Sequence, residues 1–369
     1  MLKMSRFRQV FFFGLVAAFG TGVGHAGGDG SGRLVSPELL EHAWLKAPWE
    51  NELPFRRGEK LKELFLVGDR IYAISDRNFM ACLDRENGKM VFGRSVAAPG
   101  IPVDSPKLFG DKLMSIEGKK LIELDPGTGQ KRKATDVGFS IVCPPARNSS
   151  FFYLAGPENR LHALRIEDKV EVFQVAAENE SMITSIVAEE DYVVFATDAG
   201  NVISVAADAP RRLWQFDASK GIVGALIQDG GSLFFASRDT YVYKLEIVDL
   251  PIVNMAWKYQ VDGMPEFEPR VTRDVVYQRI REKGVTAIDR QSGQLMWTVQ
   301  GGAELLAEVT GRAYVFTDAR TLVVMDNAAA KRLYTVNLAR VSRYVANTKD
   351  SRMYIGDDAG RIVCLEPVQ

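Results

Sequence analysis

A repeat of about forty residues runs through most of this chain and constrains its fold more than any other feature. Each unit holds two short apolar runs joined by a polar turn, and the last residue of the second run marks the register. The markers are Asp84, Asp125, Arg165, Ala206, Glu246, Asp289, Asp326 and Glu366. Their spacings are 41, 40, 41, 40, 43, 37 and 40 residues, so eight units fill the chain from about residue 60 onward.

The apolar runs predict β-strands. Runs such as RIYAIS, YVVFAT and AYVFT are rich in aromatic and β-branched residues and lack strict alternation. That composition is typical of strands buried on both faces. Turns that contain Asp and Gly follow the second run at 84–88, 125–129 and 289–293. Because four short strands in about forty residues is the period of a propeller blade, we expect an all-β, eight-bladed β-propeller of four-stranded blades.

An aromatic residue follows the marker by eight positions in most units. These residues are Phe92, Phe173, Trp214, Trp297 and Tyr334. Unit five delays its aromatic residue to Trp257, and unit two has Lys133 instead. We interpret the rings as wedges between neighbouring sheets, with a row of ligand-stacking aromatics as the alternative.

The last unit stops three residues beyond its marker, before an outer strand could form. Near the other end, Ser36 and Pro37 have the pattern of a helix N-cap and first turn, which predicts a short helix over 37–46. The next segment, 47–55, has the length of a strand and carries Trp49. We expect this segment to complete the last blade and close the ring, which would cover an aggregation-prone edge. Deletion of 27–55 should then cause aggregation, and deletion of 27–35 should be harmless.

The first 26 residues have the pattern of a secretory signal peptide. Lys3, Arg6 and Arg8 precede an apolar run at 10–19 that is too short to span a bilayer well, and small residues precede Gly27. The predicted organisation is a signal peptide at 1–26, an N-terminal segment with a short helix at 27–46, and a propeller at 47–369. We expect export to the periplasm or another exported location. No cysteine lies in or just after the apolar run, so we expect a soluble mature protein without a transmembrane segment.

The segments MACLDRENGKMVF and VTAIDRQSGQLMW resemble the repeat of the PQQ-like (quinoprotein) β-propellers. The resemblance covers about residues 45–369. It extends to the BamB-like outer-membrane assembly propellers, which are not enzymes. It therefore implies a protein-binding or scaffold module of the cell envelope, with envelope proteins or peptides held at its loop faces. A degenerate quinoprotein-type oxidoreductase and a small-ligand or carbohydrate binder at the channel mouth are the alternatives.

The sequence lacks the residues that this resemblance would associate with quinone chemistry. It has no adjacent cysteine pair and no Cys-x-x-Cys-His haem motif. The expected mature chain keeps His42 and His162, too few for a three-histidine metal site, and His162 is interpreted as structural. We expect no catalytic residue, no metal and no cofactor. Cys82, Cys143 and Cys364 are expected to be buried thiols, with a Cys82–Cys364 disulfide as the alternative.

Charged residues on the innermost strands and adjoining loops are the candidate ligand-binding residues. Innermost strands line the channel of a propeller, and loops at one end form its mouth. The candidates are Asp104, Glu266, Glu268, Arg270, Glu304 and Arg343. A channel whose charges pair with one another is the alternative.

Overall charge argues against a nucleic-acid partner. The formal net charge of the chain is −1. Three short basic stretches, at 55–62, 129–133 and 210–212, are interpreted as solvated turns, with a lipid or nucleic-acid patch as the alternative. We expect a monomer.

Overall fold

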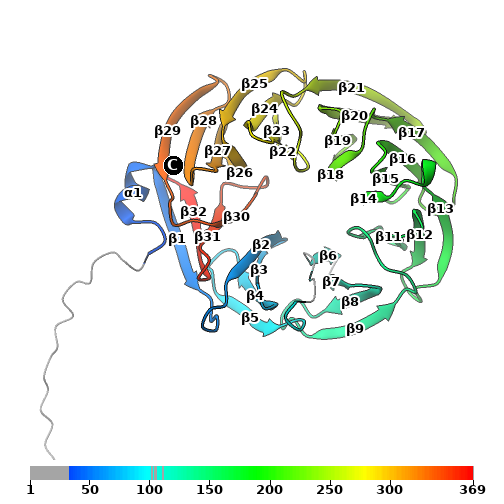
Figure 1. The fold of residues 1–369 in the computed structure, drawn as a ribbon, viewed down its shortest axis with the longest axis horizontal. Helices are drawn as coiled ribbons and strands as arrows, with labels where there is room; N and C mark the ends of the chain where they lie inside the picture. Colours follow the sequence, from blue (N-terminus) through cyan, green and yellow to red (C-terminus); the bar gives the residue numbers. More distant parts are fainter. Residues whose placement is uncertain (1–32, 101–102, 104–105, 110–111, 369) are drawn as a thin grey trace, which may run out of the picture. The chain divides into compact units, whose positions relative to one another are not determined.

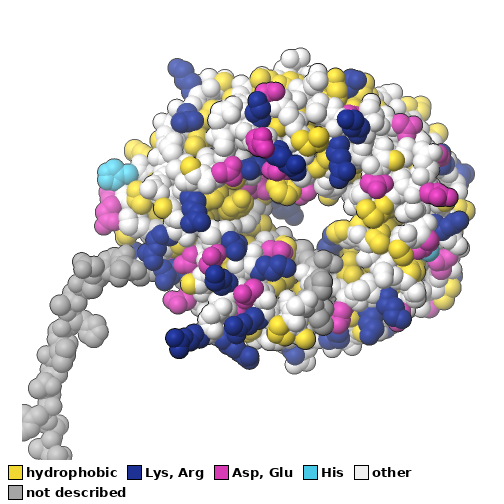
Figure 2. Space-filling view, viewed as in Figure 1, with side chains coloured by type: hydrophobic (Ala, Val, Ile, Leu, Met, Phe, Trp, Pro, Cys, Tyr) yellow, Lys and Arg dark blue, Asp and Glu magenta, His cyan; other side chains and the backbone are white. Residues whose placement is uncertain are grey.

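Eight four-stranded blades form a ring, as the repeat predicted (Figure 1). The space-filling view shows an opening at the centre of the ring (Figure 2). The computed structural model describes residues 33–100, 103, 106–109 and 112–368. The signal-peptide region lies outside the described residues. The blades belong to one compact unit, Leu34–Gln369. All strand pairs within the blades are antiparallel, so each unit of the repeat forms a meander that runs from the channel outward.

The strands of blades one to eight occupy four concentric positions. The innermost strands are β2 (Leu61–Val67), β6 (Lys107–Phe109), β10 (Ala146–Arg147), β14 (Ile183–Ala188), β18 (Ile222–Asp229), β22 (Arg270–Val271), β26 (Gly302–Val309) and β30 (Arg343–Val345). The second strands are β3 (Arg70–Ser75), β7 (Lys112–Glu117), β11 (Phe151–Ala155), β15 (Tyr192–Thr197), β19 (Ser232–Ser237), β23 (Val275–Ile280), β27 (Arg312–Thr317) and β31 (Met353–Gly356). The third strands are β4 (Phe79–Asp84), β8 (Lys120–Leu124), β12 (Arg160–Arg165), β16 (Asn201–Ala206), β20 (Tyr241–Asp249), β24 (Gly284–Asp289), β28 (Thr321–Asp326) and β32 (Arg361–Pro367). The outermost strands are β5 (Met90–Ser95), β9 (Lys131–Asp136), β13 (Glu171–Ala176), β17 (Arg212–Asp217), β21 (Ile252–Gln260), β25 (Leu295–Gln300), β29 (Lys331–Asn337) and β1 (Leu45–Glu52).

The hydrophobic core lies between the blades rather than inside any one of them. Most residues of the second and third strands are buried, as in β15, and every residue of β16 is buried. Both faces of such a strand touch a neighbouring blade, which explains why the apolar runs do not alternate with polar residues. One core cluster, for example, joins Trp49 and Tyr354 of blade eight to Leu64 and Ala81 of blade one.

Outer-strand aromatic residues wedge against the turn of the next blade, as interpreted from the sequence. Trp49 of blade eight lies on Gly88 of blade one, and Trp257 of blade five lies on Gly293 of blade six. A Cβ atom on Gly88 would lie 2.5 Å from the Trp49 ring, so the contact requires glycine there. Both glycines also have positive φ angles, 68° and 72°. The indole nitrogen of Trp257 donates a hydrogen bond to the Arg290 carbonyl oxygen of that turn at 2.9 Å.

The N-terminal segment completes blade eight, which confirms the predicted ring closure. Helix α1 (Pro37–His42) follows the N-cap Ser36 and ends four residues before position 46, because the chain enters β1 at Leu45. Strand β1 pairs antiparallel with β32, and its register shifts between Lys46 and Trp49. Pro48 is tolerated because this irregularity lies in an outermost strand.

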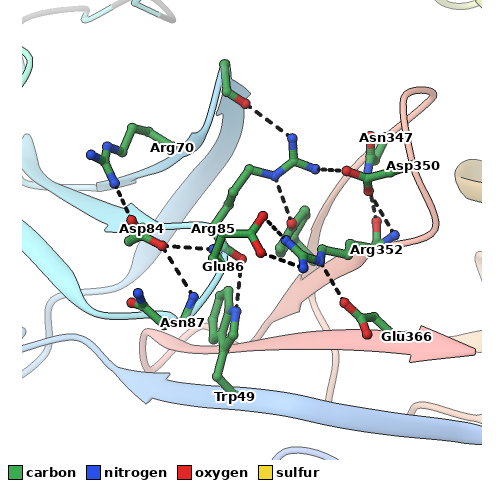
Figure 3. Close-up of polar contacts among 12 residues, drawn as sticks. Trp49, Arg70, Asp84, Arg85, Glu86, Asn87, Asn347, Asp350, Arg352 and Glu366 are labelled. Carbon is green, nitrogen blue, oxygen red and sulfur yellow. Dashed lines mark hydrogen bonds and ion pairs between the residues drawn. The ribbon is translucent and has the colours of Figure 1, made fainter.

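Polar contacts tie blade eight to blade one across this junction (Figure 3). The Trp49 indole nitrogen donates to the Arg85 carbonyl oxygen at 3.0 Å. The Arg85 guanidinium donates through Nε to the Tyr354 hydroxyl at 3.1 Å and pairs through Nη2 with Asp350. Arg352 in turn pairs with two carboxylates, Glu86 of blade one and Glu366 of blade eight.

The residues just before helix α1 contribute to the propeller core, which the sequence analysis did not anticipate. Leu34 and Val35 are buried and belong to the core cluster of blades seven and eight. The Leu34 amide also donates a hydrogen bond to Glu50 Oε1 in β1 at 3.1 Å. Deletion of 27–35 would remove these contacts, so it cannot be harmless as the sequence suggested.

All three cysteines are free and buried, as expected. Burial raises the pKa of Cys82 to about 11 and the pKa of Cys364 to about 12. Thiols with such pKa values are almost wholly protonated at neutral pH and therefore react slowly. Among the residues that the structure describes, no helix has both the length and the apolar character that a membrane crossing requires.

Candidate functional site

Arg270 joins two acidic residues at the inner edge of blades six and seven. It is the first residue of β22, and its Nη1 lies 2.6 Å from Glu268 Oε1. Its Nε and Nη2 lie 3.1 and 2.8 Å from the two carboxylate oxygens of Glu304 in β26. This two-point geometry is the strong form of an arginine–carboxylate pair and fixes one blade against the next.

A second group of ion pairs lies beside the first. The Arg279 guanidinium contacts Glu266 Oε2 at 3.1 Å and Asp318 Oδ1 at 3.2 Å. Arg281 contacts the other oxygen of Glu266, also at 3.1 Å. Figure 2 shows acidic and basic side chains intermingled around the central opening, in keeping with these alternating charges.

The pKa directions of Glu266, Glu268 and Arg270 favour their charged forms. Burial opposes ionisation of Glu268, but the nearby Arg270 outweighs it and lowers the pKa of Glu268 below its usual value. Burial also opposes the charge of Arg270, and Glu304 and Glu268 together raise its pKa. Burial opposes ionisation of Glu266 as well, yet Arg279 and Arg281 lower its pKa. Each charge is therefore compensated by a fixed partner.

Phe267 projects from these charged surroundings in an exposed position. It lies in the loop between β21 and β22, and 52% of its surface is exposed. Its neighbours Glu266 and Glu268 are held by the arginines described above, and its carbonyl oxygen accepts a hydrogen bond from Gln278 Nε2 at 2.9 Å. Met264 of the same loop is also exposed. The loop thus presents an apolar side chain from a backbone anchored on both sides.

Four of the predicted site residues come together here, whereas Arg343 lies at another blade junction. Glu266, Glu268, Arg270 and Glu304 belong to the ion pairs of blades six and seven. Arg343 lies at the junction of blades eight and one, where its Nε donates to the Leu61 carbonyl oxygen at 3.0 Å and its Nη1 lies 3.3 Å from Asp358. Asp104 lies outside the described residues. Ligand binding by these residues stays a prediction.

Sequence reasoning missed Arg279, Arg281, Asp318 and Phe267. Arg279 interrupts the otherwise buried strand VVYQRI, and a charge in such a run is a signal for a partner across the blade. Phe267 stands between two glutamates in MPEFEPR, and these charged neighbours indicate that its ring is not part of the hydrophobic core. Both features can be read from the sequence, but neither identifies what the Arg279 or Phe267 side chain contacts.

Structural roles explain the two histidines that the structure describes, His42 and His162. His162 is buried in β12, its Nδ1 lies 2.7 Å from Glu171 Oε2, and its Nε2 bonds to Glu158. The Phe139 ring stacks on it with centroids 4.1 Å apart. His42 bonds to the Glu38 carbonyl oxygen within α1, so the two histidines serve separate local structures.

The described residues do not fit the quinone cofactor of the wider PQQ-like group. Its dehydrogenases stack the quinone on adjacent cysteines, whereas the three cysteines of this chain are buried singly. Glu268 and Glu304 are already bound by Arg270, so neither is a free channel carboxylate. Within the described part of the chain, no group of three His, Cys, Asp or Glu side chains has a metal-binding arrangement.

Comparisons with known proteins agree with this architecture. Residues 227–340 match the sequence family described as outer membrane protein assembly factor BamB. The crystal structure of BamB from Moraxella catarrhalis superimposes with a TM-score of 0.65 at 14% identity, covering 87% of this chain and 97% of that one. The computationally designed Ika8 protein superimposes with a TM-score of 0.64 at 12% identity, covering 85% and 98%. No curated protein matches the chain. The resemblance to the BamB-like, PQQ-like propellers is thus confirmed.

Proposed function

We propose that this chain is an exported, non-enzymatic binding module that holds a protein or peptide partner of the cell envelope at the mouth of its channel. The observation that carries the proposal is the exposed Phe267 on a loop held by ion pairs. An aromatic side chain on a rigid support loses little conformational entropy when a partner buries it. The family description and the likeness to BamB support an envelope assembly role.

The ion pairs around Phe267 supply a polar rim to this proposed site. Glu266, Glu268, Arg270 and Glu304 are partly exposed, and a partner could add hydrogen bonds to them without breaking their own pairs. Rim charges act mainly on association rate and specificity, while a buried aromatic anchor contributes most of the affinity. Arg343 and Asp104 are proposed as further contacts around the channel. We propose that the protein is a monomer.

Substitution of Phe267 tests the proposed site directly. The Phe267→Ser variant should capture an envelope partner at least about tenfold more weakly than the wild-type chain, because central aromatic anchors dominate interface affinity. The measurement is capture from envelope extracts, followed by titration of the recovered partner against purified variants.

An equally exposed apolar residue on the hairpin of blade five provides the matched control. Ile252 is 55% exposed and lies in β21, at the end of the strand far from the Phe267 loop. Ile252→Ser should bind the partner as the wild type does. If Phe267→Ser retains full affinity, or if Ile252→Ser loses it instead, the partner does not dock at Phe267.

Export is tested at the N-terminus of the native protein. Lys3, Arg6, Arg8 and the apolar run that follows them motivate cleavage before Gly27. N-terminal sequencing of protein recovered from the envelope compartment should begin near Gly27. Recovery of the chain from cytoplasm with Met1 intact would contradict export.

A further inference from the structure

The interface between blades two and three lacks the ring-on-glycine contact found at three other blade junctions, those at Gly88, Gly129 and Gly293. Lys133 of β9 stands where other units carry an aromatic residue, eight positions after the marker. Opposite it, Lys169 occupies the turn position that Gly88, Gly129 and Gly293 fill in other blades. Its amide bonds to the Arg165 carbonyl oxygen at 2.9 Å, as the Gly88 amide does to Asp84, and its φ of 61° is positive like theirs. Both halves of the contact are therefore replaced by lysine.

A surface pocket opens where the missing ring would lie. Lys133 and Lys169 line it together with Lys112 and Arg147, and its single carboxylate is Glu123. Its floor is the buried Phe152: Lys169 Nζ lies 5.1 Å and Arg147 Cζ 5.5 Å from the centre of that ring. Four cations from two neighbouring blades thus face one space.

Most of this positive charge is not balanced within the described residues. Lys112 lies 3.5 Å from Glu123, which accounts for the one carboxylate. Arg147 donates to the Asn148 carbonyl oxygen at 3.1 Å and Lys169 donates to the Ile166 carbonyl oxygen, so the hydrogen-bond acceptors of both are uncharged. Burial lowers the pKa of Lys169, and the charges of Lys133 and Lys112 lower it further. Mutual repulsion of this kind is relieved by an anion.

Other lysines and arginines of the same strand behave differently. Lys131 Nζ lies 2.8 Å from Glu117, and Arg132 pairs with Asp125. These two side chains are solvated, paired residues, as interpreted for the stretch 129–133. Lys133, from the same stretch, is the one that faces the pocket.

We propose that Lys133, Arg147 and Lys169, with Lys112 beside them, form a binding site for a phosphate group. Three cations that have no carboxylate partner among the described residues exceed what a monovalent carboxylate can neutralise. A phosphate monoester, by contrast, carries about −1.5 to −2 charges near neutral pH. The planar guanidinium of Arg147 suits two-point contact with phosphate oxygens, and the lysines act as mobile point charges. Free phosphate and a monoester lipid headgroup share this chemistry.

Titration with inorganic pyrophosphate at constant ionic strength tests the site, using the full mature chain. The wild type should bind pyrophosphate, and Lys133→Gln should weaken the binding about tenfold, because it removes one charge-assisted hydrogen bond to the ligand. Lys131→Gln removes the same charge from the same strand and should bind as the wild type does. Equal affinities of these two variants, or no binding by the wild type, would overturn the proposal.

A double variant separates loss of the site from loss of the fold. Lys133→Trp with Lys169→Gly introduces the ring and the glycine that meet at the junctions of Gly88, Gly129 and Gly293. It should remain folded, with a urea midpoint no lower than that of the wild type, and should not bind pyrophosphate. Undiminished binding by this variant would contradict the assignment.

Vesicles identify the source of the phosphate. Wild-type protein and Lys133→Gln are sedimented with phosphatidylcholine vesicles that contain or lack phosphatidic acid. Sedimentation that requires both phosphatidic acid and Lys133 identifies a lipid headgroup. Pyrophosphate binding without such sedimentation identifies a soluble phosphate compound.

Discussion

Replacing Trp49 with alanine should lower the free energy of unfolding by about 3–5 kcal/mol, the usual cost of removing a buried tryptophan. Only 8% of Trp49 is exposed, and its ring packs on Gly88 and stacks with Tyr354 at a centroid distance of 6.0 Å. The substitution would also leave the Arg85 carbonyl oxygen without its indole donor. The lost contacts lie at the junction of blades eight and one, which joins the two ends of the propeller. Both blades should therefore be destabilised together. Urea denaturation measures the change.

Trp44 provides the control. It is the same residue type five positions earlier, and 68% of its surface is exposed. Trp44→Ala should change stability by no more than about 0.5 kcal/mol, as is usual for surface substitutions. If Trp49→Ala unfolds at the wild-type midpoint with the wild-type slope, the ring does not depend on this contact for closure.

Removing 27–55 should prevent the mature chain from folding as a cooperative, soluble propeller. The deletion takes away β1, so the backbone of β32 loses its outer partner along the whole strand. It also removes Leu45 and Leu53, which are buried in the cores on either side of blade eight. An unpaired, apolar strand edge is a template for aggregation. Size-exclusion chromatography and urea denaturation should show aggregates and no single sharp transition.

A shorter deletion, 27–32, is the control for this experiment. It leaves Arg33 and all later described residues in place. We expect a soluble protein with the wild-type urea midpoint. A 27–55 deletion that unfolds like this control would show that blade eight is completed without β1.

Local periodicity along the chain was sufficient to predict the blades and their closure. The even spacing of markers such as Asp84, Asp125 and Glu366 predicts repeated hairpins, and seven of the eight units do form their blade's backbone hydrogen bonds from their own four strands. Ring closure was predicted because the segment around Trp49 has the length of a strand and carries the aromatic residue of an outer strand, and β1 does pair with β32. Neither inference required knowledge of how one blade packs on the next.

The pairing of charged residues became visible only in the folded chain. Arg270 and Glu304 are 34 residues apart, and Lys133 and Lys169 are 36 apart, yet each pair spans one blade junction. Arg343 was predicted among the channel-lining charges and lies on an innermost strand, but its Nε donates to the Leu61 carbonyl oxygen of blade one. Periodicity says which strand a residue occupies. A side chain between two blades meets a partner that depends on how one sheet is rotated against the next. It also depends on the distance between the two sheets, which is set by the aromatic rings and glycines at their junction.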